Sequence, residues 1–299
     1  MTVRTQPLTL ADGRVVEVFL GGDPAGYPLV MHHGTPADAT TFADWHAPCQ
    51  ARGLRLICAS RPGYAASTRL AGRSVADVAA DVSAILDWLG HSRFITAGWS
   101  GGGPHALACA ALLADRCAAA ATLAGVGPLG ADDLDFLAGM GPENIAEFGA
   151  AMEGEPALRL WMQANAEPLR AVTGEALAEA FGGLVPEIDK HVLVGGYADQ
   201  LASVFRRALE PGFGGWIDDD LAFTKPWGFS VASIRVPVVV WQGDLDLMVP
   251  FAHGRWLLGS ISGARGQMVP GHGHISLVAR YRDEVLADLQ RSADHTKLG

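Results

Sequence analysis

Short apolar runs alternate with longer stretches of helical periodicity in the first half of the chain. Five of these runs are candidates for buried strands: residues 15–20, 29–31, 54–58, 94–97 and 119–124. Ser74 and Asp77 form a helix-start signature, and apolar residues follow at helical spacing as far as Leu89. A further helix is predicted over residues 104–113. Apolar strands that alternate with helices indicate a parallel sheet covered on both faces.

The pattern changes after Gly127 and Pro128. As far as about residue 229 there are helix-like stretches, such as 176–181 and 198–209, but no strong strand. Strands resume at residues 236–241 and 266–269, and a helix at residues 281–289 follows them. We therefore expect a sheet domain of residues 1–127 and 230–299, interrupted by a helical insertion of residues 128–229.

Charge divides the chain in the same way. Residues 126–231 contain 17 acidic and 6 basic residues, a net −11, whereas the remainder, with 15 acidic and 16 basic, carries +1. We expect the acidic insertion to disfavour anionic substrates, unless its carboxylates lie on outer helix faces far from the pocket. The run Asp218, Asp219 and Asp220 is predicted to be a solvated helix face rather than a calcium site, because it lacks alternating ligand spacing.

Overall composition limits the partners. A net charge of −10 argues against nucleic acid and against an anionic membrane surface. No apolar run approaches the roughly 18 residues of a membrane span, and the first residues lack the apolar stretch of a signal peptide. The four cysteines show no C-x-x-C spacing and are predicted to be small buried thiols: Cys49, Cys58, Cys109 and Cys117. We expect a cytoplasmic monomer or homodimer that acts on a small-molecule substrate.

A G-x-S-x-G motif follows the apolar run at residues 94–97. It consists of Gly98, Trp99, Ser100, Gly101 and Gly102. A strand that turns at once into a helix strains the backbone of the middle residue, and small residues two positions away let the chains pass. The Ser100 hydroxyl would then stand at the carboxyl edge of the sheet, facing the positive end of the next helix. A glycine-rich turn can also be purely structural, so the motif alone does not establish a nucleophile.

A nucleophilic serine also needs a base, an orienting acid and donors for the oxyanion. The loop after residues 236–241 contains two candidate acids, and the loop after residues 266–269 two candidate bases: Asp244 and Asp246, then His272 and His274. The backbone amides of Gly101 and Thr35 are the candidate oxyanion donors, since Pro36 has no amide to offer. The order serine, acid, histidine, each after a strand, strengthens the case for catalysis.

Several segments resemble motifs of the α/β-hydrolase superfamily, and the resemblance covers nearly the whole chain. His33-Gly34-Thr35-Pro36 is similar to the H-G-x-P oxyanion loop, Arg61-Pro62-Gly63-Tyr64 to the R-P-G-x-G turn, and residues 98–104 to the nucleophile elbow of the cap-bearing serine hydrolases. The turn departs from the family at Ala65, where a second glycine is usual. The G-x-x-D-x-x-x-P spacing of Gly243 and Pro250 selects Asp246 over Asp244, and the loop P-G-x-G-H-x-S-L selects His274 over His272.

The resemblance implies an α/β fold with a mostly parallel central sheet, flanked by helices and bearing a helical cap. It implies catalytic roles for Ser100, Asp246 and His274, with Thr35 and Gly101 as the oxyanion hole and no cofactor. His33 and Trp99 are expected beside the substrate pocket. The predicted reaction is hydrolysis of a small carboxylic ester or lactone.

Other interpretations remain open at this stage. The same residues would suit an aminopeptidase similar to proline iminopeptidases, in which cap carboxylates bind a substrate ammonium, or a carbon–carbon bond hydrolase. Some members of this fold only bind a small ligand, so a receptor is a further alternative. His32, His33, His272 and His274 could in principle form a metal site, but no H-E-x-x-H pattern accompanies them, and no metal is predicted.

Overall fold

The computed structural model describes residues 4–295, and its centre is an eight-stranded sheet in the order β1-β2-β4-β3-β5-β6-β7-β8. The strands are β1 (Thr5–Thr9), β2 (Val15–Gly22), β3 (Tyr27–His32), β4 (Leu54–Ala59), β5 (Phe94–Trp99), β6 (Cys117–Leu123), β7 (Val238–Gly243) and β8 (Arg265–Val269). Strands β3 to β8 run parallel, whereas β2 pairs antiparallel with both β1 and β4. The predicted mostly parallel sheet is therefore confirmed. Strand β1 was not predicted, because it is a largely exposed edge strand without an apolar run.

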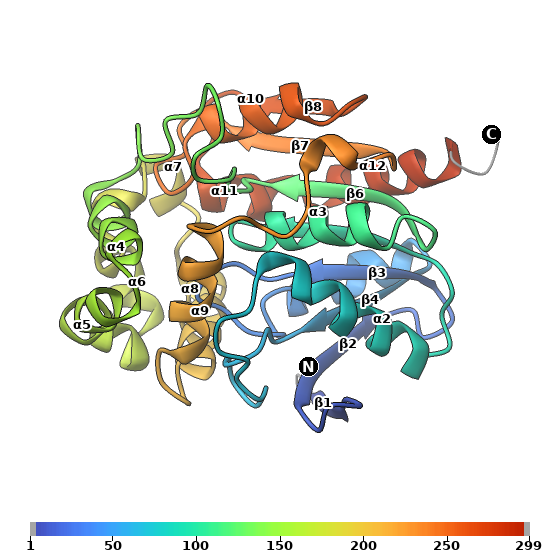
Figure 1. The fold of residues 1–299 in the computed structure, drawn as a ribbon, viewed down its shortest axis with the longest axis horizontal. Helices are drawn as coiled ribbons and strands as arrows, with labels where there is room; N and C mark the ends of the chain where they lie inside the picture. Colours follow the sequence, from blue (N-terminus) through green and yellow to red (C-terminus); the bar gives the residue numbers. More distant parts are fainter. Residues whose placement is uncertain (1–3, 296–299) are drawn as a thin grey trace.

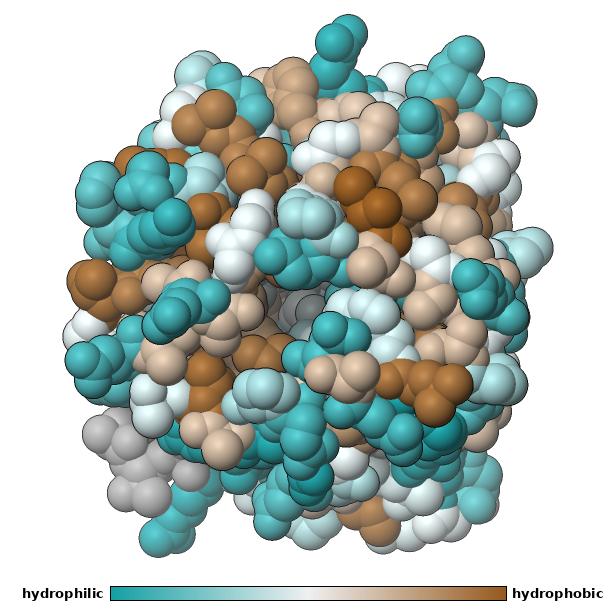
Figure 2. Space-filling view, turned by 90° about the vertical axis from the view of Figure 1, so that its left-hand side faces the viewer, coloured by the Kyte–Doolittle hydropathy of each residue, from teal (hydrophilic) through white to brown (hydrophobic). Residues whose placement is uncertain are grey.

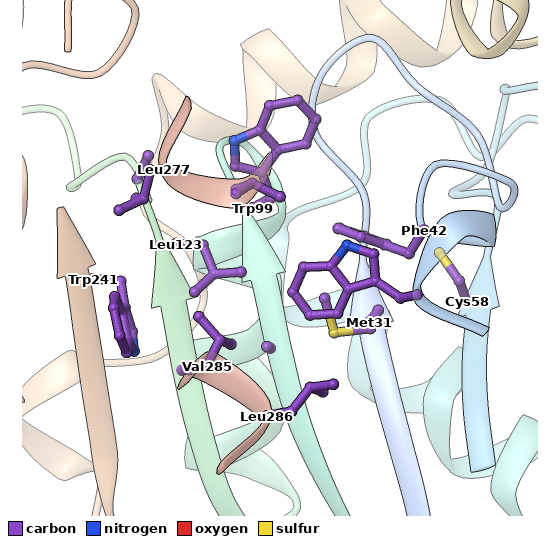
Figure 3. Close-up of a cluster of buried hydrophobic side chains, with 14 of the residues drawn as sticks. Met31, Phe42, Cys58, Trp99, Leu123, Trp241, Leu277, Val285 and Leu286 are labelled. Carbon is purple, nitrogen blue, oxygen red and sulfur yellow. The ribbon is translucent and has the colours of Figure 1, made fainter. Parts of the chain in front are cut away.

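Helices cover both faces of this sheet (Figure 1). They are α1 (His46–Ala51), α2 (Val78–Trp88), α3 (Gly102–Leu112), α10 (Phe251–Ser260), α11 (His274–Arg280) and α12 (Arg282–His295). Helices α2, α3 and α10 pack on one face, and α1, α11 and α12 on the other. Figure 3 shows the second face, where Met31, Leu123 and Trp241 of three strands meet Leu286 of α12. The core on this face continues beyond the sheet to Phe205, which lies between β6 and β7 in the sequence.

Residues 128–229, which we call the helical segment, connect β6 to β7 without forming a strand. Their α-helices are α4 (Pro142–Glu153), α5 (Glu155–Asn165), α6 (Gly174–Ala180), α7 (Glu187–Lys190), α8 (Gly195–Ala208) and α9 (Gly214–Phe223). In Figure 1 these helices gather at the left, beyond the carboxyl ends of the parallel strands. The predicted domain bounds, and a separate cap domain, remain predictions.

Helix α9 is buried on all sides, including Asp218, Asp219 and Asp220. The prediction of a solvated face for these residues is wrong. Three arginines from the loop between β4 and α2 supply the missing counter-charges: Arg69 Nε lies 2.8 Å from Asp218 Oδ2, Arg61 Nη2 2.6 Å from Asp219 Oδ2, and Arg73 Nη2 2.7 Å from Asp219 Oδ1. Burial alone would raise the pKa of Asp219, but Arg61 and Arg73 outweigh it and hold that pKa well below its usual range.

Ion pairs of the opposite sense also join the helical segment to the rest of the chain, with the basic group in the segment and the acidic groups outside it. Arg207 of α8 makes the reverse contacts, with 2.6 Å from Nη2 to Glu17 Oε1 and 2.6 Å from Nε to Asp38 Oδ2. Acidic and basic groups of the two regions thus neutralise one another. These pairs use two acidic residues and one basic residue of the segment, so most of the acidic excess counted along the sequence remains.

Two expectations about composition can be compared with the structure. Cys49, Cys58, Cys109 and Cys117 are all buried and free, as predicted. None of the helices in residues 4–295 is both long and apolar enough to span a bilayer.

The Asp219 ion pairs generate a stability prediction. Asp219→Asn should lower the free energy of unfolding by about 3–5 kcal/mol, because Arg61 and Arg73 would stay charged in a buried site without a counter-charge. Urea denaturation measures this difference. Asp12→Asn removes an exposed partner of Arg14 and should change stability far less. Equal losses in the two variants would contradict the prediction.

Candidate active site

Ser100 lies at the turn from β5 into α3 and has a positive φ of 57°. A Cβ on Gly98 would lie 1.9 Å from the Gly102 carbonyl oxygen, and one on Gly102 would lie 2.1 Å from the His32 carbonyl oxygen. Both positions therefore require glycine, for the steric reason that the sequence suggested. The turn holds Ser100 at the carboxyl edge of the sheet in a backbone conformation that costs about 1–3 kcal/mol elsewhere.

His274 is the first residue of α11, and its Nδ1–H donates to Asp246 Oδ2 at 2.8 Å. The other carboxylate oxygen of Asp246 accepts the amides of Met248 and Val249, at 2.9 and 2.8 Å. These bonds fix the carboxylate, and the carboxylate fixes the imidazole tautomer. The Nε2 atom of His274 is thereby left with a lone pair that can accept a proton.

The two competing residues make other contacts. Asp244 Oδ1 accepts the amide of Gly271 at 2.7 Å. His272 places Nδ1 3.0 Å from the Pro270 carbonyl oxygen, and its ring meets the edge of Tyr281. Both residues stabilise the loop that carries His274. The structure thus brings Asp246, and not Asp244, to His274.

Ser100 and His274 line one cavity of about 430 Å³, between the sheet edge and the helical segment. Figure 2 views the molecule from the side of the helical segment and shows a hollow near the middle of that side. Trp99 lines the same cavity, and its indole packs against the His274 ring with 5.4 Å between the centroids. Within residues 4–295 no hydrogen bond joins Ser100 Oγ to the His274 ring, so the two side chains share the cavity wall without a direct link.

The two predicted oxyanion residues, Thr35 and Gly101, also border this cavity. They are immediate neighbours, since a Cβ on Gly101 would lie 2.4 Å from Thr35 Oγ1. The side chain of Thr35 is held from behind: its hydroxyl donates to Asp219 Oδ2 at 2.7 Å and accepts from Arg61 Nη2 at 3.0 Å. The buried ion pair of α9 therefore fixes the loop whose amide would face a substrate.

His33 was expected beside the pocket, and the structure corrects this. Among the described residues that line the cavity His33 is absent, because its side chain is fully buried behind the oxyanion loop. Its Nδ1–H donates to the Gly34 carbonyl oxygen at 2.7 Å, and Nε2 accepts the Arg61 amide at 3.0 Å. Burial and the Arg61 guanidinium hold the pKa of His33 well below its usual range. His33 is thus a neutral residue that joins two loops.

Sequence reasoning missed Asp189, which comes from α7 of the helical segment. Its Oδ2 accepts the amide of Ile275 at 3.0 Å, and its Oδ1 accepts the amide of Ser276 at 2.9 Å. These amides belong to the first turn of α11, the helix that begins with His274. No local pattern could reveal this contact, because it joins segments that are distant in the sequence.

Three further carboxyl groups line the cavity and were also missed: Glu143 and Glu147 of α4, and Asp220 of α9. Trp216 Nε1 donates to Glu147 Oε1 at 2.6 Å. Burial raises the pKa of Glu147 to about 7, and burial beside the Glu147 carboxyl raises the pKa of Asp220 well above its usual range. Around neutral pH the pair therefore holds on to a proton that ordinary carboxyl groups would have lost.

The metal alternative gains no support. Residues 4–295 contain no cluster of three or more histidine, cysteine, aspartate or glutamate side chains arranged to hold a metal ion. His32 instead places Nε2 3.7 Å from Cys109 Sγ, and burial lowers the pKa of His32 to about 3.

Glu147 generates a prediction about pH. Its pKa is about 7 in the folded protein against 4.5 in the unfolded chain, so the folded state binds more protons between these values. This contribution makes the free energy of unfolding fall as the pH rises from about 4.5 to 7. Glu147→Gln removes this contribution. The free energy of unfolding of the variant minus that of the parent, measured by urea titration, should therefore increase from pH 4.5 to 7. A difference in unfolding free energy that stays constant with pH would contradict the assignment.

Comparisons with known proteins agree with this architecture. Residues 27–152 match the family model described as the alpha/beta hydrolase fold. A hydrolase from Pseudomonas aeruginosa superposes with a TM-score of 0.71 at 18% identity, over 96% of this chain and 98% of that one. An esterase from Exiguobacterium antarcticum gives 0.71 at 20% identity, over 97% and 100% of the two chains. An enol-lactonase from Burkholderia xenovorans gives 0.67 at 21%, over 96% and 100%.

No significant match was found among curated proteins. Identities this low establish the fold and leave the reaction open. The matching family model, the order of the strands and the strained serine turn after β5 agree with one another. Residues 27–152 therefore match the alpha/beta hydrolase family model, and the described chain has the α/β-hydrolase fold.

Proposed function

We propose that the protein is a serine hydrolase that cleaves a small carboxylic ester or lactone through an acyl-enzyme. One observation carries the proposal: His274, oriented by Asp246, borders the same cavity as Ser100, which the strained turn presents to that cavity. A base fixed by a carboxylate beside a strained serine is the arrangement that nucleophilic acyl transfer requires.

The proposed reaction has two halves. His274 Nε2 takes the proton of Ser100 as Oγ attacks the substrate carbonyl carbon, and the amides of Thr35 and Gly101 stabilise the oxyanion. The carbon–oxygen bond to the leaving alcohol then breaks, and His274 returns the proton to that oxygen. A water molecule deprotonated by His274 next attacks the acyl-enzyme, which releases the acid and restores Ser100.

In this proposal the helical segment acts as a cap. It contributes much of the cavity wall, including Trp161, Phe205 and Trp216, and these side chains would exclude water from the acyl-enzyme. The similar esterase and enol-lactonase structures support an ester or lactone as substrate through the shared fold.

One observation favours a second candidate, an aminopeptidase-like hydrolase. Glu147 and Asp220 give the cavity two carboxyl groups that a neutral ester does not need. No observation favours a carbon–carbon bond hydrolase. A receptor without catalytic activity is separated from both hydrolases by turnover of simple 4-nitrophenyl esters.

Ser100 should react with an organophosphonate probe, because the probe forms a stable adduct with an activated serine. Mass spectrometry should find the adduct on the peptide that contains Ser100. Ser100→Ala should abolish labelling while circular dichroism shows a folded protein. An adduct on another serine would overturn the assignment.

His274→Ala and Asp246→Asn should lower kcat for a 4-nitrophenyl ester, by on the order of a thousandfold or more for the histidine and somewhat less for the acid. His272→Ala and Asp244→Asn are the matched controls, since the side chains of both residues make their contacts away from Asp246 and His274. Steady-state kinetics of the four variants tests the choice. If kcat falls severely in a control variant and only mildly in its counterpart, the assignment of that catalytic residue is reversed.

A further inference from the structure

Glu147 of α4 and Asp220 of α9 both line the cavity that Ser100 and His274 border, and each carboxyl group affects the pKa of the other. Their side chains are almost fully buried, with residue exposures of 8% and 1%. Two carboxyl groups close together in an apolar setting cannot both ionise without a compensating positive charge. The rest of the cavity wall is largely apolar. Burying two carboxyl groups in such surroundings costs free energy, and a ligand that hydrogen-bonds to them would offset that cost.

The protein supplies few donors to this pair. Glu147 Oε1 accepts the indole N–H of Trp216 at 2.6 Å, whereas Asp220 Oδ2 is buried and receives no hydrogen bond. Within the described residues neither carboxyl forms an ion pair. The neighbouring residue Asp219 forms the ion pairs with Arg61 and Arg73, and the charge of Arg73 lowers the pKa of Asp220 less than burial and Glu147 raise it. The cavity therefore presents acceptor oxygens that lack a cationic partner.

The other charged groups near Glu147 and Asp220 do not supply the missing cationic partner. On α9, Asp219 is matched by the two arginines of the loop after β4. On α4, Glu143 also lines the cavity: its Oε1 accepts the Gly183 amide at 2.9 Å, and its buried Oε2 has no donor. Glu143 adds a third carboxylate at the same wall. The excess at this end of the cavity is thus negative.

We propose that Glu147 and Asp220 form a subsite for the ammonium group of a substrate, so that the preferred substrates are esters or amides that carry a primary or secondary amine. As a statement about substrates, this rests on the proposed hydrolase function. An ammonium donates two or three hydrogen bonds and brings the positive charge that lets both carboxyl groups ionise. A hydroxyl group brings one donor and no charge, so it would leave the two carboxyl groups sharing a proton.

Binding can be tested apart from catalysis, with the Ser100→Ala protein at pH 7. Isothermal titration calorimetry with benzylammonium chloride should show binding, and comparison of two buffers with different ionisation enthalpies should show release of the shared proton. Benzyl alcohol is the neutral probe of the same size and should bind more weakly without releasing a proton. Equal affinities for the two probes, with no proton released, would overturn the subsite.

Variants then assign the effect to the pair. Glu147→Gln and Asp220→Asn keep the size and hydrogen-bonding shape of the side chains. Each should reduce the ratio of benzylammonium to benzyl alcohol affinity by about tenfold or more, the usual worth of a hydrogen bond to a charged group. Glu153→Gln, an exposed position on the same helix, is the matched control and should leave the ratio unchanged. An unchanged ratio in both test variants would overturn the proposal.

Turnover distinguishes this inference from the proposed function. The parent protein should hydrolyse 4-nitrophenyl 6-aminohexanoate with a higher kcat/KM than 4-nitrophenyl heptanoate, and Glu147→Gln should reduce that preference. Hydrolysis of both esters at equal rates would leave a hydrolase without the ammonium subsite. Carboxylate-dependent binding of benzylammonium with no turnover of either ester would retain the subsite and refute the hydrolase.

Discussion

The ion pair between Asp219 and Arg61 is the contact on which the arrangement of the site depends. Asp219 comes from the helical segment, whereas Arg61 follows β4 of the sheet. The same carboxylate accepts the hydroxyls of Thr35 and Tyr64, at 2.7 and 2.8 Å. Arg61 also donates to the Gly34 carbonyl oxygen at 2.8 Å. One buried charge pair thus joins helix α9, the loop after β4 and the candidate oxyanion loop, and its partners cannot move independently without exposing an uncompensated charge.

Three consecutive aspartates in α9 meet three different environments, because successive residues of a helix point about 100° apart. Asp218 pairs with Arg69 at the margin of the segment, and Asp219 is enclosed by two arginines. Asp220 faces the cavity beside Glu147. The three identical side chains therefore have different roles. Asp218 forms a partly exposed ion pair, Asp219 a buried one, and Asp220 is a polar group of the cavity wall. Desolvation is the same kind of cost in each case, and only the partner differs.

The helical segment contributes more than cavity wall. Asp189 binds the first amides of α11, and so the helix that begins with His274 depends on a carboxylate from α7. Asp219 acts in the same way on the loop that contains Thr35. Groups of the segment therefore hold both the histidine side and the oxyanion side of the site. A change in the packing of these helices would be felt at the reacting atoms, because a displacement of about 1 Å is enough to disturb catalytic geometry.

The sequence by itself determined the parallel strands, the helix after Ser74 and the serine turn, because these follow from local patterns of apolar residues and from the steric need for Gly98 and Gly102. It narrowed the acid and the base to two candidates each, and spacing similar to a known family chose between them. Only the tertiary structure decided what depends on distant partners. The run from Asp218 is buried because arginines more than a hundred residues earlier reach it, and His33 lies behind its loop because Arg61 binds there. The contacts of Asp189 and Glu147 have the same origin, since burial of a polar residue is decided by the partner that folding brings to it.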